Sequence, residues 1–231
     1  MIIKSYLNCT EQDVKSKKFN IFVGISLGNK YFSKENIRKY VLWALENTKE
    51  DVLVLIADAN NAINYEVLNA YNPERALQVA LRKGDETEES IKKIVRGLPK
   101  KKHLLVKIGR WKDARKSKYY KDKIKIFLNE FQENKAFHDF IIKIVQENLG
   151  SKAKTMDLRK LEKLSLYVLD ELPIFLNGVE FEEKRYNLHP YPGISDLDDL
   201  LMGLQDSVLF PEIAKMLKIK HKIAVVEAYV E

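Results

Sequence analysis

The chain has 231 residues, of which 45% are hydrophobic and 32% charged, and its formal net charge is +7. This length and composition predict one domain, residues 1–231, with a substantial hydrophobic core. No run of 18 apolar residues is present, which excludes a transmembrane helix, and the polar stretch after Leu7 argues against a signal peptide. Because there is one cysteine, Cys9, and the four histidines are scattered, we expect no disulfide, metal or cofactor in a cytoplasmic protein.

The segment 19–33 predicts a buried strand, a glycine-containing turn and a helix that begins after Ser33. This order is typical of a doubly wound α/β sheet, in which ligands bind at the carboxyl ends of the strands. Ser26 lies at such an end and is a candidate nucleophile. The alternative is that Gly24 and Gly28 only relieve backbone strain and that Ser26 is a passive turn residue.

The rest of the chain alternates between predicted strands and predicted helices. Short apolar runs predict strands at residues 51–57, 103–108 and 223–230. Periodic apolar patterns predict helices at residues 60–70, 72–96, 118–131, 136–149 and 158–172. The second of these helices is expected to pause near Gly84, and the last to end before Pro173. The alternation predicts an α/β fold with a mostly parallel sheet covered by helices on both faces.

Positive charge is concentrated in residues 100–126, which hold twelve Lys or Arg against two Asp. This segment therefore carries +10, and the rest of the chain carries −3. A run of charge is usually a solvated surface. Such a concentration also suits contact with the phosphates of a nucleic acid.

A second candidate site lies far along the chain. Tyr167 and Glu171 are four residues apart in a predicted helix, so their side chains share one face. A partly buried tyrosine beside an exposed glutamate would show the same spacing. Twenty residues beyond Glu171, Tyr191 lies in a stretch rich in proline and aromatic residues, which is too stiff for a plain linker.

Three motifs in this order resemble those of the tRNA-dependent cyclodipeptide synthases. GISLGNKYFS, residues 24–33, resembles the nucleophile motif of that family, and YVLDELP, residues 167–173, resembles its Tyr-xxx-Glu helix. Tyr191 stands at the spacing of the family's second catalytic tyrosine. Weaker agreement comes from two dipeptides, Trp43-Ala44 and Arg110-Trp111. The resemblance spans roughly residues 19–192 and implies a Rossmann-like fold, similar to the catalytic domain of the class Ic aminoacyl-tRNA synthetases.

The resemblance implies an aminoacyltransferase that forms a diketopiperazine from two aminoacyl-tRNAs without ATP. The implied mechanism is ping-pong, through an aminoacyl-enzyme and a dipeptidyl-enzyme on Ser26. The catalytic positions that carry over are Ser26, Asn29, Tyr167, Glu171 and Tyr191. Tyr167 and Glu171, helped by Asn29, would anchor the α-ammonium group. Glu171 would also accept a proton from the attacking amine, and Tyr191 would assist proton transfer during cyclisation.

The resemblance also implies binding residues. The first side-chain pocket would be lined by Phe22, Gly24, Leu55, Ile174 and His189. Asn148 would contact the second aminoacyl group. Contacts with tRNA are expected from eight cations, Arg82, Lys83, Lys92, Lys93, Arg96, Lys100, Lys101 and Lys102. Four acids interrupt this basic stretch, namely Asp85, Glu86, Glu88 and Glu89. They shift the expected footprint toward residues 92–102 and the basic run beyond them.

Two features of the chain depart from the family's usual patterns. Asn29, typical of one branch, is combined with Tyr191-Pro192, typical of the other. His189 falls where an aliphatic residue would suit leucine or phenylalanine. Since an unpaired buried imidazole disfavours an apolar side chain, this predicts a polar residue in the product, with Glu first and Gln or His next. Without the resemblance, a surface loop histidine would be the simpler interpretation.

Two other functions each fit part of the sequence. A serine esterase or acyltransferase on small substrates would use Ser26 but leaves the basic segment unexplained. A non-catalytic RNA-binding Rossmann-like domain would explain residues 100–126 but gives no role to Tyr167, Glu171 and Tyr191. In each case we expect the chain to act as a monomer.

Overall fold

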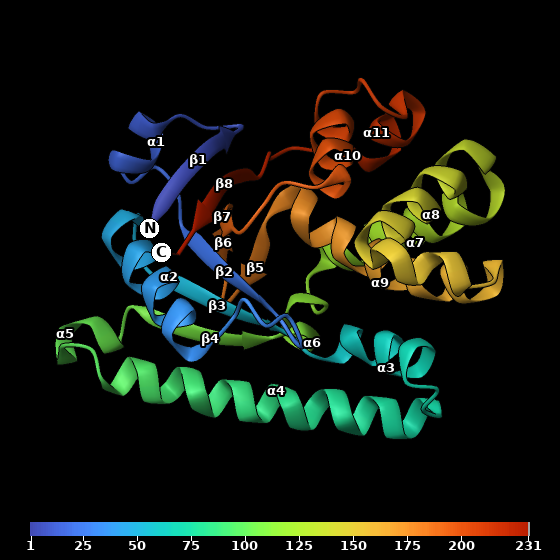
Figure 1. Ribbon diagram of the computed structural model, residues 1–231. Helices are drawn as coiled ribbons and strands as arrows, with labels where there is room; N and C mark the ends of the chain where they lie inside the picture. Colours follow the sequence, from blue (N-terminus) through green and yellow to red (C-terminus); the bar gives the residue numbers. More distant parts are fainter. Residues whose placement is uncertain (231) are drawn as a thin grey trace.

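The computed structural model describes residues 1–230 and is built around a six-stranded sheet (Figure 1). The strand order is β1-β8-β7-β2-β3-β4, and every neighbouring pair is parallel except β1 with β8. The strands of this sheet are β1 (Ile2–Leu7), β2 (Ile21–Ser26), β3 (Val52–Ala57), β4 (Val106–Arg110), β7 (Leu188–Tyr191) and β8 (Ala224–Tyr229). The predicted mostly parallel sheet with helices on both faces is confirmed.

Helices cover the sheet on both faces because its central strands are apolar on both sides. All six residues of β3 are buried. One face packs against α2 (Lys34–Asn47) and α4 (Pro73–Arg96), with Tyr40 and Ile91 in the core between them. The other face packs against α6 (Trp111–Ala114) and the end of α9 (Leu158–Asn177).

A third hydrophobic cluster joins the helices on the right of Figure 1. These are α7 (Lys118–Glu133), α8 (Lys135–Leu149), α9, α10 (Asp196–Gln205) and α11 (Pro211–Leu217). The remaining elements are α1 (Glu11–Lys15), η1 (Ala59–Asn61), α3 (Ala62–Leu68), α5 (Lys100–His103), η2 (Gly150–Thr155) and the hairpin β5 (Val179–Phe181) with β6 (Lys184–Tyr186).

The order of the strands places a crevice at the end of β2. From β2 the chain proceeds to β3 and β4 on one side, and it later adds β7 and β8 on the other side. Such a reversal is a topological switch point, and ligands of doubly wound folds bind there, outside the carboxyl ends of the strands. Ser26 ends β2 and Tyr191 ends β7, so both candidate residues lie at this switch point.

The structure corrects three predicted boundaries. α4 does not pause at Gly84, where a Cβ atom would lie 2.4 Å from Nη2 of Arg110, so the glycine makes room for that guanidinium. α9 does not end before Pro173 but continues to Asn177, because buried apolar residues of its last turn offset the hydrogen bond that proline cannot donate. The strand predicted from residue 103 begins at Val106, after the short α5.

Candidate active site

The turn after β2 holds Ser26 at the open end of the sheet. The backbone amide of Asn29 donates to the carbonyl of Ser26 over 3.4 Å and closes a four-residue turn. Gly28 has φ +84°, in the left-handed region that favours glycine. α2 then begins after Ser33, whose hydroxyl accepts a hydrogen bond from the amide of Asn36, as the sequence predicted.

β7 brings Tyr191 against this turn. Its hydroxyl lies 3.3 Å from Oγ of Ser26, within hydrogen-bond distance, although the two residues are 165 positions apart in the chain. Tyr191 also hydrogen-bonds to Asn29, and burial raises the pKa of its hydroxyl. The sequence predicted that Tyr191 lies within a stiff stretch that is no plain linker. The structure places Tyr191 at the end of β7, a strand that the sequence did not predict.

α9 presents Tyr167 and Glu171 to the same point. Glu171 is only 8% exposed, and burial raises the pKa of its carboxyl group to about 8. A hydrogen bond with Tyr167 acts in the opposite direction, while the charges of Asp170 and Asp198 raise the pKa further. Tyr167 also hydrogen-bonds to Ser26. At neutral pH the carboxyl group of Glu171 is therefore largely protonated in the free protein.

These residues share one cavity of about 500 Å³, a typical size for a small-molecule site. All five predicted catalytic residues line it, namely Ser26, Asn29, Tyr167, Glu171 and Tyr191. Five of the six predicted substrate-binding residues line it too, namely Phe22, Gly24, Leu55, Asn148 and His189. The structure thus brings together residues from both ends of the chain.

Ile174 is the exception to that prediction. It is buried in the core with Phe22 and Leu55, behind the cavity wall rather than on it. Its neighbour Phe175 lines the cavity instead, because the ring of Phe175 stacks on His189 at a centroid distance of 5.2 Å and covers that part of the wall.

His189 is an unusual part of the wall because its ring is buried among aromatic side chains. The ring of His189 stacks on the ring of Phe22 at a centroid distance of 4.5 Å. The ring of Tyr191 lies tilted beside it, at a centroid distance of 5.1 Å. Burial lowers the pKa of the imidazole to about 3, and Nε2 has no hydrogen-bond partner among the described residues. A Cβ atom on Gly24 would lie 2.8 Å from Nε2, so this glycine leaves the space that the ring needs.

Several cavity residues were not predicted from the sequence. Asn61 and Asn64 face the cavity from the η1–α3 segment, Trp111 from α6 and Asp198 from α10. Asp198 accepts hydrogen bonds from the backbone amide and hydroxyl of Ser195, which form a capping box. The Ser-x-x-Asp spacing before an apolar run was the available signal for this helix start.

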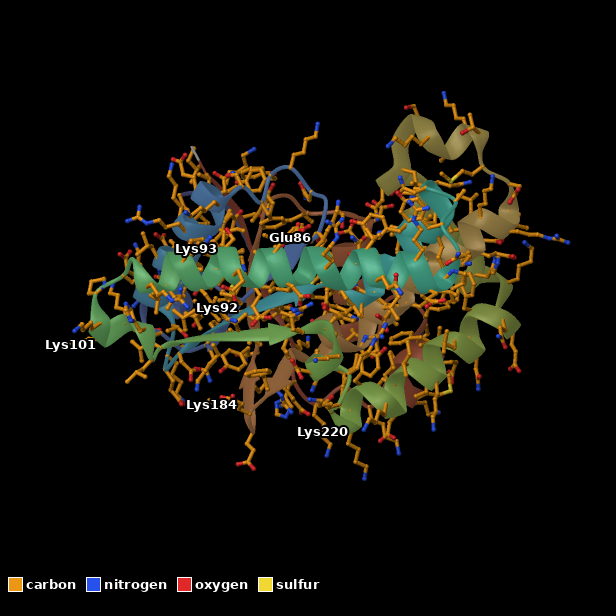
Figure 2. All side chains as sticks on the ribbon, turned by 90° about the horizontal axis from the view of Figure 1, so that it is seen from below. Glu86, Lys92, Lys93, Lys101, Lys184 and Lys220 are labelled. Carbon is orange, nitrogen blue, oxygen red and sulfur yellow. The ribbon has the colours of Figure 1, made fainter. Side chains whose placement is uncertain are left out.

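The eight cations predicted to bind tRNA fall into two groups. Some have partners within the chain: Arg82 lies 3.4 Å from Glu86, Lys83 lies over the ring of Tyr65, and Lys92 pairs with two glutamates at 2.8 and 2.9 Å. The others have no ion pair in the part of the chain that the structure describes, namely Lys93, Arg96, Lys100, Lys101 and Lys102. Figure 2 shows Lys93 and Lys101 near the end of α4 and on α5.

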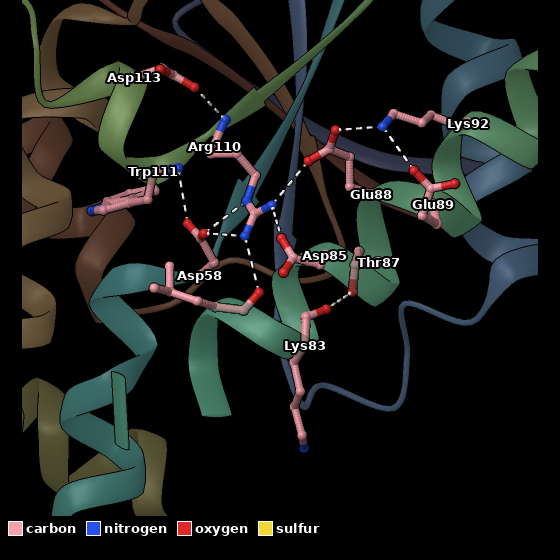
Figure 3. Close-up of polar contacts among 11 residues, drawn as sticks. Asp58, Lys83, Asp85, Thr87, Glu88, Glu89, Lys92, Arg110, Trp111 and Asp113 are labelled. Carbon is pink, nitrogen blue, oxygen red and sulfur yellow. Dashed lines mark hydrogen bonds and ion pairs between the residues drawn. The ribbon is translucent and has the colours of Figure 1, made fainter. Parts of the chain in front are cut away.

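Two of the acids that interrupt the basic helix bind Arg110 (Figure 3). The guanidinium of Arg110 donates to Asp85 over 2.7 Å, to Glu88 over 2.9 Å and to Asp58 over 2.8 Å. Asp58 is 1% exposed and follows β3, whereas Asp85 and Glu88 belong to α4. These acids therefore attach α4 to the sheet rather than repelling a ligand at its surface.

A second, smaller hollow of about 200 Å³ lies on the other side of the Ser26 turn. It is formed by residues 25–29, the start of α2, and Glu86, Thr87 and Ser90 of α4. The middle of α4 thus lies beside the candidate nucleophile. Among residues 1–230 no cluster of His, Cys, Asp and Glu has the arrangement of a metal site, and no helix is long and apolar enough to cross a membrane.

Comparison with known proteins identifies the family. The cyclodipeptide synthase family model matches residues 8–211. The chain belongs to the cyclodipeptide synthase family. A cyclo(L-leucyl-L-leucyl) synthase of Staphylococcus haemolyticus is 27% identical over 182 residues, which cover 74% of this chain and 73% of that protein. Membership makes the chain a tRNA-dependent aminoacyltransferase and sets aside the esterase and non-catalytic alternatives.

Solved structures support the same fold. A cyclodipeptide synthase structure from Staphylococcus haemolyticus has a TM-score of 0.75, with 21% identity over 98% of this chain and 99% of that chain. One from Candidatus Glomeribacter gigasporarum, bound to Phe-tRNAPhe, has a TM-score of 0.60, with 15% identity over 92% and 88%. The tyrosyl-tRNA synthetase of Archaeoglobus fulgidus has a TM-score of 0.53, with 12% identity over 95% and 58%. The predicted likeness to the synthetase catalytic domain is therefore confirmed.

Proposed function

We propose that this cyclodipeptide synthase works through an aminoacyl ester on Ser26. The single observation that carries the proposal is that Ser26, Tyr191, Tyr167 and Glu171 meet on one cavity at the switch point of the sheet. The substrate is already an activated ester, so a hydroxyl without a histidine base is a sufficient nucleophile. A bond forms from Ser26 Oγ to the aminoacyl carbonyl, the bond to the ribose oxygen breaks, and the serine proton ends on that oxygen.

The turn offers a donor for the oxyanion of this step. The backbone amide of Gly28 has no acceptor among the turn, loop and side-chain hydrogen bonds of the described residues, whereas the register of β2 with β3 directs the amide of Leu27 toward Ala57. Gly28 follows the end of a strand and precedes the N-terminus of α2, where peptide dipoles favour negative charge.

Glu171 suits the next step because of its raised pKa. A carboxyl group with a pKa of about 8 is matched to an α-ammonium group, whose usual pKa is about 7.7–8.0. Glu171 can therefore both bind the ammonium of the aminoacyl ester and take its proton. The freed amine attacks the second aminoacyl-tRNA, the second ribose oxygen leaves, and a dipeptidyl ester remains on Ser26.

Tyr191 is placed for the closing step. The second amine attacks the ester carbonyl on Ser26, the six-membered ring closes, and Ser26 Oγ leaves. The hydroxyl of Tyr191, 3.3 Å from Oγ, can supply the proton that the leaving oxygen needs.

Labelled aminoacyl-tRNA tests the covalent step. After incubation and denaturation, the wild-type protein should retain label and Ser26→Ala should not. Ser90→Ala is a matched control, because Ser90 faces the hollow on the other side of the same turn and should leave labelling intact. Equal label on wild type and Ser26→Ala would reject the covalent ester.

We further propose that one residue of the product is polar, with glutamate first. The support is the orphaned Nε2 of His189 in the cavity wall, which an incoming carboxylate or amide could satisfy. His189→Leu should shift the diketopiperazines in the medium of expressing bacteria toward leucine, methionine or phenylalanine, as measured by mass spectrometry. A wild-type profile made only of aliphatic and aromatic diketopiperazines would contradict this proposal. The related Staphylococcus protein, a cyclo(L-leucyl-L-leucyl) synthase, is named for a product of that aliphatic kind.

A further inference from the structure

Trp111 is held at both ends by buried carboxylates. Its indole is 1% exposed and lines the cavity. Its backbone amide donates to Asp58 over 3.1 Å, and its indole Nε1 donates to Asp170 over 2.5 Å. Each carboxylate has its own arginine, Arg110 for Asp58 and Arg115 for Asp170. The backbone amide and the indole of one residue therefore contact two similar ion pairs, and these two pairs can be compared.

Asp170 is only 6% exposed, and each of its carboxylate oxygens accepts two hydrogen bonds. Oδ1 accepts from Nε of Arg115 over 3.1 Å and from the hydroxyl of Tyr120. Oδ2 accepts from Nη2 of Arg115 over 2.6 Å and from Trp111. The four donors come from residues 111–120, so this one carboxylate ties α9 to α6 and the start of α7.

Asp170 is also the immediate neighbour of Glu171. Successive residues of a helix point about 100° apart, so Asp170 faces the α6–α7 segment while Glu171 faces the cavity. The ionisable groups that act on Glu171 are Tyr167 and Asp170 on α9, Asp198 on α10 and Tyr191 on β7. After burial and the hydrogen bond with Tyr167, the negative charge of Asp170 has the largest influence on the pKa of Glu171, and it raises that pKa.

We propose that Asp170 is a positioning residue with two roles. Its hydrogen bond holds Trp111 in the cavity wall, and its negative charge acts on the neighbouring carboxyl group of Glu171, which accepts the proton. Arg115 determines how much of the Asp170 charge reaches Glu171. The proposal rests on the proposed function, in which Glu171 takes the proton of the ammonium group.

Two substitutions should act in opposite directions. Asp170→Asn keeps the shape, removes a negative charge and leaves Arg115 uncompensated, so the pKa of Glu171 should fall. Arg115→Met keeps Asp170 but removes its counter-charge, so the pKa of Glu171 should rise. Shifts of about one pH unit are expected from changes in a neighbouring charge.

The measurement is the conversion of the labelled aminoacyl-enzyme after mixing with a second aminoacyl-tRNA at pH 6 to 9. The rate should rise with pH as Glu171 loses its proton. The midpoint should move to lower pH in Asp170→Asn and to higher pH in Arg115→Met. Trp111→Phe removes the Nε1–H donor to Asp170 together with part of the ring, and it should move the midpoint upward by less than Arg115→Met does. This variant keeps the proposal testable if Asp170→Asn does not fold.

Asp58→Asn is the matched control. It breaks the ion pair at the other end of Trp111 and should destabilise the protein in a similar way, yet it should leave the midpoint at the wild-type pH. Midpoints that coincide with the wild type, or that move in one direction in all variants, would overturn the role of Asp170. A wild-type enzyme that never carries label on Ser26 would instead overturn the proposed function itself.

Discussion

In the cavity, Glu171 and His189 are buried without an oppositely charged partner, whereas on α4 the acidic residues Asp85 and Glu88 share one guanidinium. Burying a polar group without a partner costs free energy, and pairing offsets much of that cost. The cavity therefore keeps a carboxyl group without a counter-charge and an imidazole nitrogen without a hydrogen-bond partner, both of which a substrate could satisfy. On α4, by contrast, the acids are used within the chain.

The same difference explains why the basic helix contains so many acids. Glu86 pairs with Arg82. Glu88 and Glu89 pair with Lys92 (Figure 3), so both cations already have partners within the chain. A count of the cations along the sequence would therefore overestimate the number that can bind phosphate, because paired residues contribute little to the attraction of a polyanion.

The largest effect is expected when Arg110 is removed. Arg110→Ala leaves Asp58 buried without its cation, and breaking a buried pair in this way costs about 3–5 kcal/mol. Urea denaturation measures the loss. Asp85→Asn is the control, because Asp85 is 71% exposed and should change stability by less than about 0.5 kcal/mol. Similar losses in both variants would show that Arg110 does not hold α4 through Asp58.

A smaller change, of opposite sign, is expected at Glu171. The unfolded chain releases this proton near pH 4.5, whereas the folded protein holds it until about pH 8, so stability falls as the pH rises between these values. At pH 7 the cost is about 3 kcal/mol. Glu171→Gln cannot ionise and should therefore be more stable than the wild type at pH 7, while making no product.

Denaturation at two pH values checks this prediction. The gain from Glu171→Gln should be present at pH 7 and absent at pH 4.5. Glu212→Gln, at an exposed glutamate of α11, should show no such difference. An equal gain at both pH values would mean that the variant stabilises by packing rather than by removing a buried charge.

Local signals predicted much of the fold. The caps at Ser33 and Asn72 and the apolar runs of β2 and β3 are encoded within a few residues, and the structure has these elements where the sequence predicted them. β7 was missed because it has only four residues, and β1 was missed because its six residues are partly exposed and form no continuous apolar run. Both strands also depend on partners far along the chain. β1 pairs with residues more than 200 positions away, which no local pattern records.

The site shows the same limit. The ordered motifs around Ser26, Glu171 and Tyr191 predicted which residues share a cavity, because the spacing of family motifs carries information that single residues do not. The ion pairs around Trp111 could not be predicted in this way. Asp58 and Asp170 lie more than 50 positions from it on either side, and each looks like an ordinary acid in the sequence.

The smallest effects, on tRNA affinity, separate paired from unpaired cations. Lys93→Gln and Arg96→Gln should each flatten the slope of log affinity against log salt by up to about 0.9, because each removes one potential phosphate contact. Arg82→Gln and Lys92→Gln are matched controls on the same helix and should change the slope much less, since their charges are already paired with glutamates.

Filter binding of several aminoacyl-tRNAs between about 50 and 200 mM salt measures these slopes. The proposal that these cations contact phosphate rather than the amino acid predicts that every tRNA is weakened alike and that the product keeps its identity. Equal slopes for all four variants would place the tRNA elsewhere, and a changed product would place these cations in the substrate pocket.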